Sequence, residues 1–155
     1  MSGPFNPLAG DFRTTGWIAE TGDYNLKIVK VEYKMIGNDA PKPVLTFTVA
    51  VADGPFENKR PSAIQVWEPE SDYSQAGRVI MAAKGYIPGK QDQEFAADNP
   101  DLDLTLDSTD PDNLKLGAGY EELVSSVFTC TLGQITGKKD GKTYQTFKNI
   151  RPLGA

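Results

Sequence analysis

Lysines and aromatic residues gather near the end of the chain and around one tryptophan, a combination whose chemistry suits nucleic-acid strands. Ammonium and guanidinium groups neutralise phosphates, and flat aromatic rings stack on unpaired bases. The candidates in the last part of the chain are Lys138, Lys139, Lys142, Tyr144, Phe147, Lys148 and Arg151. The candidates earlier in the chain are Lys34, Lys42, Arg60 and Trp67.

The segments that carry these candidates alternate apolar and polar residues, which predicts β-strands. In the first strand the alternation changes phase after Ile28, and this predicts a bulge or a strong bend. A helical pattern follows: Ser74 is a suitable N-cap, apolar residues recur at helical spacing up to Tyr86, and Pro88-Gly89 ends the helix. The predicted strands are 23–35, 44–52, 62–68, 126–135 and 143–150.

The order of these elements predicts an all-β fold with a small helical insertion. Three consecutive strands, a helix and a closing hairpin describe a five-stranded OB-type Greek-key barrel, with the helix between strands three and four. A generic β-sandwich is the alternative. Residues 1–155 fit a single domain. We expect an extended N-terminal arm over residues 1–22 and an acidic insertion over 90–125, with a short strand at 102–106 and a helical turn near 120–123.

On such a barrel, oligonucleotides bind across the second and third strands, between the loops of the first and last hairpins. These loops hold Lys34 and Lys42 on one side and the lysines of segment 138–142 on the other. If the aliphatic residues of the third strand fill the barrel, Trp67 points outwards on the binding face. The competing interpretation is that strand aromatics belong to the core and that loop lysines only face solvent.

The composition argues against catalytic machinery. The chain has no histidine and one cysteine, Cys130, which excludes Ser-His-Asp triads, Cys-His pairs and multi-thiolate zinc sites. Gly137 and Gly141 are too closely spaced for a phosphate loop and precede a strand, and the acidic residues of 101–112 lack the EF-hand pattern. We therefore expect a protein that is not an enzyme, with no cofactor and no metal; a carboxylate-metal nuclease is the catalytic alternative.

The net charge of −5 is divided unevenly along the chain. Residues 91–125 hold ten acidic residues and one basic residue, whereas the rest holds 11 acidic and 15 basic residues. Only the mildly basic part needs to face phosphates. The acidic segment is expected to be a solvated insertion. Alternatively, it imitates the charge of DNA or docks on a basic partner, which would make the chain a protein-interaction module.

The sequence predicts a cytoplasmic protein with no membrane partner. No apolar run approaches the length of about 20 residues that spans a bilayer. The first residues lack the basic and apolar regions of a secretory signal. A single cysteine also suits a reducing compartment.

Three stretches of the sequence have the form of motifs found together in one protein family. They are the Gly22-Asp23-Tyr24 start of the first strand, LTFTVAVADGPFENKR over 45–60, and YQTFKNIRP over 144–152. Together they resemble bacteriophage-encoded OB-fold single-stranded-DNA-binding proteins, over roughly residues 22–86 and 126–152. This resemblance implies sequence-independent coating and protection of single-stranded DNA during phage replication or recombination, in the host cell cytoplasm. It also implies replication or recombination proteins as further partners, with a homo-oligomer as one option.

Overall fold

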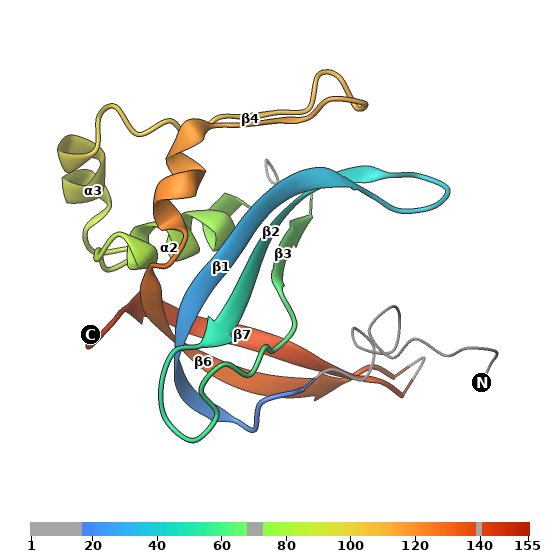
Figure 1. Ribbon diagram of the computed structural model, residues 1–155, viewed down its shortest axis with the longest axis vertical. Coiled ribbons are helices and arrows are strands. Elements are labelled where there is room, and N and C mark those ends of the chain that lie inside the picture. Colours follow the sequence, from blue (N-terminus) through green and yellow to red (C-terminus); the bar gives the residue numbers. More distant parts are fainter. Residues whose placement is uncertain (1–16, 68–72, 139–140) are drawn as a thin grey trace.

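A five-stranded antiparallel sheet is the framework of this computed structural model, which describes residues 17–67, 73–138 and 141–155. The strands lie in the order β3-β2-β1-β6-β7 (Figure 1). Two strands therefore flank the long first strand on each side, and the mostly β architecture is as predicted. The strands are β1 (Gly22–Ile36), β2 (Lys42–Val51), β3 (Ile64–Trp67), β6 (Val127–Thr136) and β7 (Thr143–Pro152).

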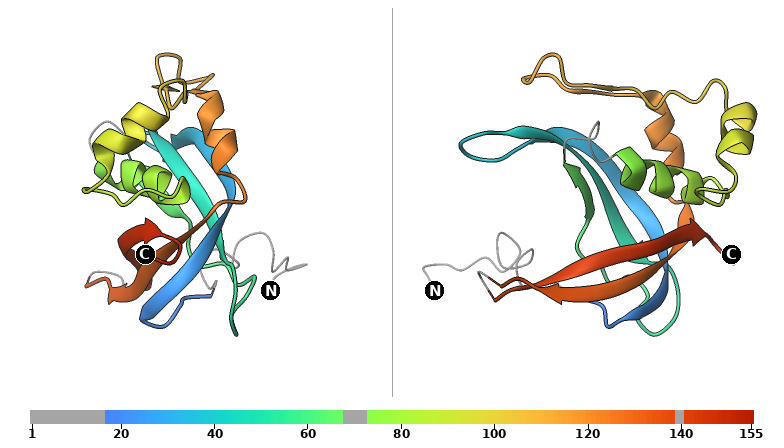
Figure 2. Two further views of the ribbon diagram at one scale, coloured as in Figure 1. Left: turned by 90° about the vertical axis from the view of Figure 1, so that its left-hand side faces the viewer. Right: turned by 180° about the vertical axis from the view of Figure 1, so that it is seen from behind.

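Strand β1 joins the two halves of the sheet because it pairs along both of its edges. Residues 26–36 pair with β2, and residues 22–27 pair with β6. The register with β2 shifts between Ile28 and Lys30, so the predicted bulge is confirmed. A bulge bends a strand and increases its twist, and the two halves of the sheet accordingly stand at an angle to each other (Figure 2).

Strands β3 and β7 form the two edges of the sheet. Within the described ranges no ladder joins them, so the hydrogen-bonded sheet is open between these strands. Strand β3 begins at Ile64, two residues later than predicted. Residue 68, the predicted last residue of this strand, lies outside the described residues.

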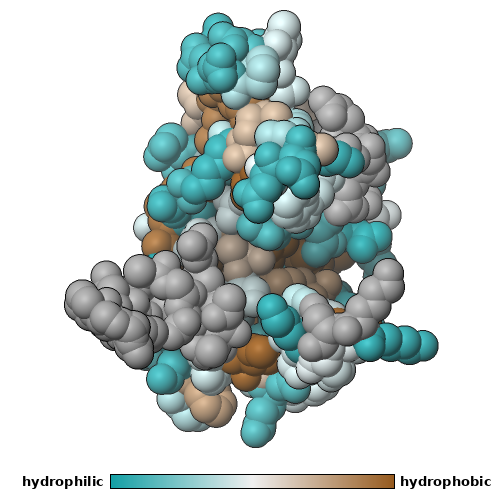
Figure 3. All heavy atoms as spheres, turned by 90° about the vertical axis from the view of Figure 1, so that its right-hand side faces the viewer, coloured by the Kyte–Doolittle hydropathy of each residue, from teal (hydrophilic) through white to brown (hydrophobic). Residues whose placement is uncertain are grey.

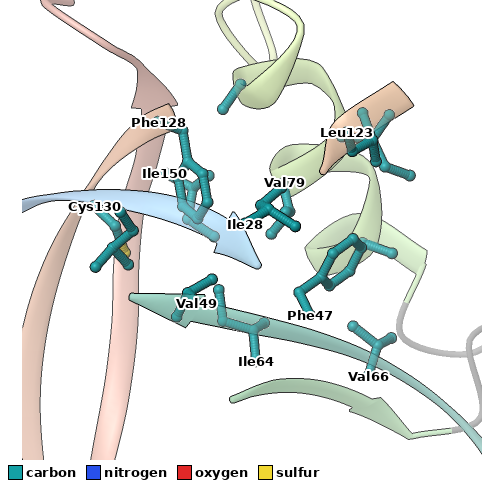
Figure 4. Packing of buried hydrophobic residues seen from close by; sticks show 14 of the residues in the cluster. Ile28, Phe47, Val49, Ile64, Val66, Val79, Leu123, Phe128, Cys130 and Ile150 are labelled. Atoms are coloured by element: carbon teal, nitrogen blue, oxygen red, sulfur yellow. The ribbon is translucent and has the colours of Figure 1, made fainter. Parts of the chain in front are cut away.

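The hydrophobic core fills the space between the sheet and helix α2 (Tyr73–Ala83), as Figure 4 shows. The helix lies between the third and fourth strands of the sheet along the chain, as predicted. It ends earlier than expected because Gly85 adopts a φ of +94° and the N–H of Tyr86 bonds to the carbonyl of Met81, which closes the last turn. The fully buried side chains include Leu26, Ile28, Leu45, Phe47, Val49, Val66, Val79, Leu123, Phe128 and Leu132.

The acidic insertion contains more regular secondary structure than its sequence predicts. The predicted strand at 102–106 is displaced to a short hairpin, β4 (Leu106–Asp107) and β5 (Lys115–Leu116). The expected helical turn is present as the 3-10 helix η1 (Ala118–Leu123). Helix α3 (Asp92–Asp98) was not predicted; acidic residues in its first turn favour the helix N-terminus.

The described part of the N-terminal arm packs on the sheet. Ala19 is fully buried, and its N–H donates to Oε1 of Gln145 at 2.7 Å. The carbonyl of Ala19 accepts a hydrogen bond from Nε2 of Gln134 at 2.9 Å. The predicted extended arm therefore ends in an anchored segment before β1, and its residues 1–16 lie outside the described residues.

No helix in the described part of the chain is long and apolar enough to cross a membrane.

Cys130 is expected to be chemically silent in the folded protein. Its side chain is fully buried, and burial raises the pKa of the thiol to about 12. Because the thiolate is the nucleophile, an aromatic disulfide reagent at mildly alkaline pH should leave the native protein unlabelled. The same reagent should label one thiol per chain after unfolding in urea. Fast labelling of the native protein would contradict the packing around Cys130.

Candidate nucleic-acid interface

One side of β1, β2 and β3 points away from the core and carries Trp67. Directly paired residues of neighbouring strands point to the same side of a sheet, and Trp67 pairs with Val44. Ile64 and Val66 are buried, whereas Trp67 is 43% exposed, so the predicted outward position of the tryptophan is confirmed. We call this side the outer face; the register assigns to it Lys27, Lys30, Glu32, Lys34, Ile36, Lys42, Val44, Thr46, Thr48, Ala50, Gln65 and Trp67. Val44, Thr46 and Ala50 are buried, so the exposed part of this face consists of the lysines, Gln65 and Trp67.

The outer face is positively charged because its four lysines stand against one glutamate. Glu32 lies between two of these lysines on β1. Its carboxylate oxygens are 3.4 Å from Nζ of Lys30 and 3.3 Å from Nζ of Lys34. Both lysine side chains are more than half exposed, so their ammonium groups remain accessible to a larger anion.

Three of the predicted site residues, Lys34, Lys42 and Trp67, come together on the outer face. Lys34 and Trp67 both pair with Val44, which places them about 10 Å apart on either side of one residue. Lys27 and Lys30 also lie on the outer face, although they were not among the predicted site residues. The signal that could have found them is their position on the polar side of the first strand once the bulge is taken into account.

The β6–β7 hairpin separates its predicted site residues between its two sides. Tyr144 and Lys148 are exposed on the side away from the core. Phe147 pairs with the buried Leu132 and packs against the core cluster. The ring of Phe147 therefore lies on the core side of the hairpin, opposite to Tyr144. The competing interpretation, in which strand aromatics belong to the core, predicts this position.

The other basic candidates lie outside the outer face. Lys138 and Lys142 are exposed at the tip of the β6–β7 hairpin, and Lys139 lies outside the described residues. Arg60 is exposed in the loop that precedes β3, at the end of that strand opposite to Trp67. The structure does not bring Arg60 together with the tryptophan.

Arg151 is engaged within the fold. Its Nη2 lies 3.1 Å from Oδ2 of Asp23. The hydroxyl of Thr131 donates to the same carboxylate at 2.6 Å. This hydrogen bond, together with the charge of Arg151, holds the pKa of Asp23 below its ordinary value. Part of the charge of Arg151 is therefore compensated inside the protein.

The two hairpins that carry basic candidates extend on the same side of the molecule. Front and back views show the tips of β1–β2 and β6–β7 on that side, with β3 between them (Figures 1 and 2). A view onto this side shows hydrophobic residues among hydrophilic ones in the middle of the molecule (Figure 3). The hairpin that carries Lys34 and Lys42 and the hairpin that carries Lys138 and Lys142 thus flank the strand that holds Trp67.

The acidic insertion contributes its apolar side chains to the core. Leu106 and Leu116 pair with each other and pack against the core cluster. Hydrogen bonds from the hydroxyl and N–H groups of the threonines two residues further on hold the pKa values of Asp103 and Asp107 below their ordinary range. These carboxylates therefore stabilise turns. Among the described residues, no group of three or more His, Cys, Asp or Glu side chains is placed to hold a metal ion.

No protein-family model matches the sequence, and no curated protein matches it either. The interpretation of the outer face therefore rests on its own chemistry, a tryptophan ring beside exposed ammonium groups.

Replacement of Trp67 by alanine should cost little stability. A half-exposed ring contributes about 1 kcal/mol, roughly half of what full burial of a large side chain provides. Replacement of the fully buried Phe47 by alanine should cost about 3–5 kcal/mol, because it opens a cavity. Urea unfolding of both variants measures the difference. A loss for Trp67→Ala as large as that for Phe47→Ala would contradict the outward position of the tryptophan.

Proposed function

We propose that the protein binds single-stranded DNA without sequence preference, through the outer face. The observation that carries this proposal is the position of the exposed Trp67 beside the lysines of β1 and β2. A ring of this kind can stack on any unpaired base, while the lysines neutralise phosphates on either side. The contacts are available to every sequence, because each base has a flat face and each nucleotide has a phosphate.

We further propose that the sheet belongs to an OB-type barrel. The order of the strands in the sheet supports this fold, because β1 pairs with both β2 and β6. The position of α2 along the chain, between the third and fourth strands of the sheet, supports it as well. The closing contact of such a barrel joins β3 to β7, the two edges of the sheet. Binding across the second and third strands between two hairpin loops is the usual mode of these barrels, and the outer face has this location.

The biological role that fits this binding mode is the coating and protection of exposed strands. Continuous coating needs neither a reacting group nor a cofactor, and the proposed contacts are electrostatic and stacking contacts only. From the resemblance of the sequence to phage single-strand-binding proteins we propose that this role belongs to replication or recombination, with proteins of these processes as further partners.

Tryptophan fluorescence tests the proposal directly. Trp17 packs against Tyr24 and Phe56, with ring centroids 6.2 and 5.4 Å away, so Trp17→Phe keeps an aromatic ring there and leaves Trp67 as the only reporter. Titration with oligo-dT should quench the fluorescence of Trp67, whereas a duplex of equal length should bind poorly, because its bases are already stacked.

In a separate assay, Trp67→Ala should weaken binding of oligo-dT by about 1–3 kcal/mol with an unchanged salt dependence. Equal affinity for the duplex would refute the stacking mode.

Glu32 provides a test of the electrostatic part. Glu32→Gln removes the carboxylate that neutralises Lys30 and Lys34, so binding of oligo-dT at low salt should tighten about two- to fivefold. Glu121→Gln is the matched control, since Glu121 is exposed on η1 away from the outer face. Unchanged affinity for Glu32→Gln would mean that the lysines of β1 do not contact the strand.

A further inference from the structure

A groove with a volume of about 810 Å³ lies between α2 and the β1-β6-β7 part of the sheet. Arg78 of α2 and the turn at Pro88-Gly89 line one side of it. Polar side chains of three strands, Asp23, Thr131 and Arg151, line the other side. The groove is separate from the outer face of β1–β3, and its arginines suggest an anionic ligand.

A hydrogen-bond network fixes the strand side of this groove. Asn149, with a φ of +52°, turns its side chain so that Nδ2 donates to the Thr131 hydroxyl at 3.3 Å. That hydroxyl donates to Asp23, which holds Arg151. The left-handed backbone of Asn149 lies beside the register shift between β6 and β7, and such irregularities often re-aim side chains towards a site.

The two arginines retain hydrogen-bond donors for a ligand. The guanidinium of Arg151 uses three of its N–H groups on Asp23 and on the carbonyls of Asn149 and Ala155. An arginine has five such donors. Arg78 is exposed, and it has no hydrogen bond or ion pair to any other residue that the structure describes. Two guanidinium groups therefore have free donors in one groove.

The charge of the groove also favours an anion. Arg78 and Arg151 outnumber Asp23, whose carboxylate is already paired. Lys148 is exposed and pairs with Thr131, so it adds a third positive charge on the same side of the sheet. Guanidinium groups bind phosphate oxygens through parallel N–H bonds, which makes phosphate the anion that best matches these donors.

We propose that this groove binds a phosphate of the same DNA strand that occupies the outer face. This inference rests on the proposed function and extends the interface along β1. Asp23 in the groove and Lys34 beside Trp67 are eleven residues apart on this strand, at most about 36 Å. Only a long oligonucleotide reaches both places.

Oligonucleotide length therefore tests the proposal. Arg78→Gln removes the charge and keeps a side chain of similar length, and Lys115→Gln is the matched control, an exposed lysine of β5 outside the groove. Binding is measured with oligo-dT of about 4 and about 16 nucleotides, the range of site sizes for one OB fold. Arg78 is exposed, so both variants should melt like the parent protein.

The expected result is a loss that depends on length. Arg78→Gln should weaken binding of the long strand about two- to fivefold and lower its log–log salt slope by about 0.7, the contribution of one phosphate contact. The short strand, held at Trp67, should bind as before, and Lys115→Gln should change neither. Unchanged binding of the long strand, or an equal loss for both lengths, would overturn the phosphate site. If the parent protein binds neither strand, the proposed function itself fails.

Discussion

Strand β1 forms hydrogen bonds with two neighbouring strands, and the rest of the structure depends on how its length is divided between them. Its first residues pair with β6 and its later residues pair with β2, with a bulge at the point where the side-chain alternation shifts. The bulge lets the side chains of Ile28 and Val31 both face the core, although the two residues are three positions apart, a spacing that places side chains on opposite sides of a regular strand. Without the shift, one half of the strand would turn its apolar side chains to solvent. The lysines of β1 reach the outer face for the same reason.

The sequence predicts the strands of the sheet well, because the alternation of apolar and polar residues follows directly from the two-residue repeat of a strand. Turn residues mark where each strand ends. The sequence places Trp67 outwards correctly, since its neighbour Val66 belongs to the core. The sequence does not predict side-chain positions that depend on tertiary contacts. The sequence alone does not reveal that Phe147 packs inwards or that Arg151 is held by Asp23, a residue far away along the chain. Helix α3 was not predicted because its acidic residues are typical of a loop. In the structure, Phe95 of this helix packs edge-to-face on Tyr86, a tertiary contact that the sequence does not reveal.

The acidic and basic parts of the chain are organised differently in space. The lysines of the outer face lie on the strands β1 and β2, whose backbones are fixed by the ladder between them. Asp103 and Asp107, by contrast, are used in local turns of the insertion. The net charge of the chain, which is −5, is therefore a poor guide to the surface that a polyanion would meet. Surface potential depends on where charges are held, and here four lysines of β1 and β2 share one face.

The position of Glu32 between two lysines has a kinetic consequence for any polyanion on the outer face. Its carboxylate is tethered 3.3–3.4 Å from both ammonium groups, so its local concentration there is high and constant. When a bound phosphate leaves either ammonium group, the carboxylate competes with it for that group. The glutamate thus acts as a built-in competitor that shortens the residence time of each contact. On the proposed function, a bound strand would leave the outer face one contact at a time.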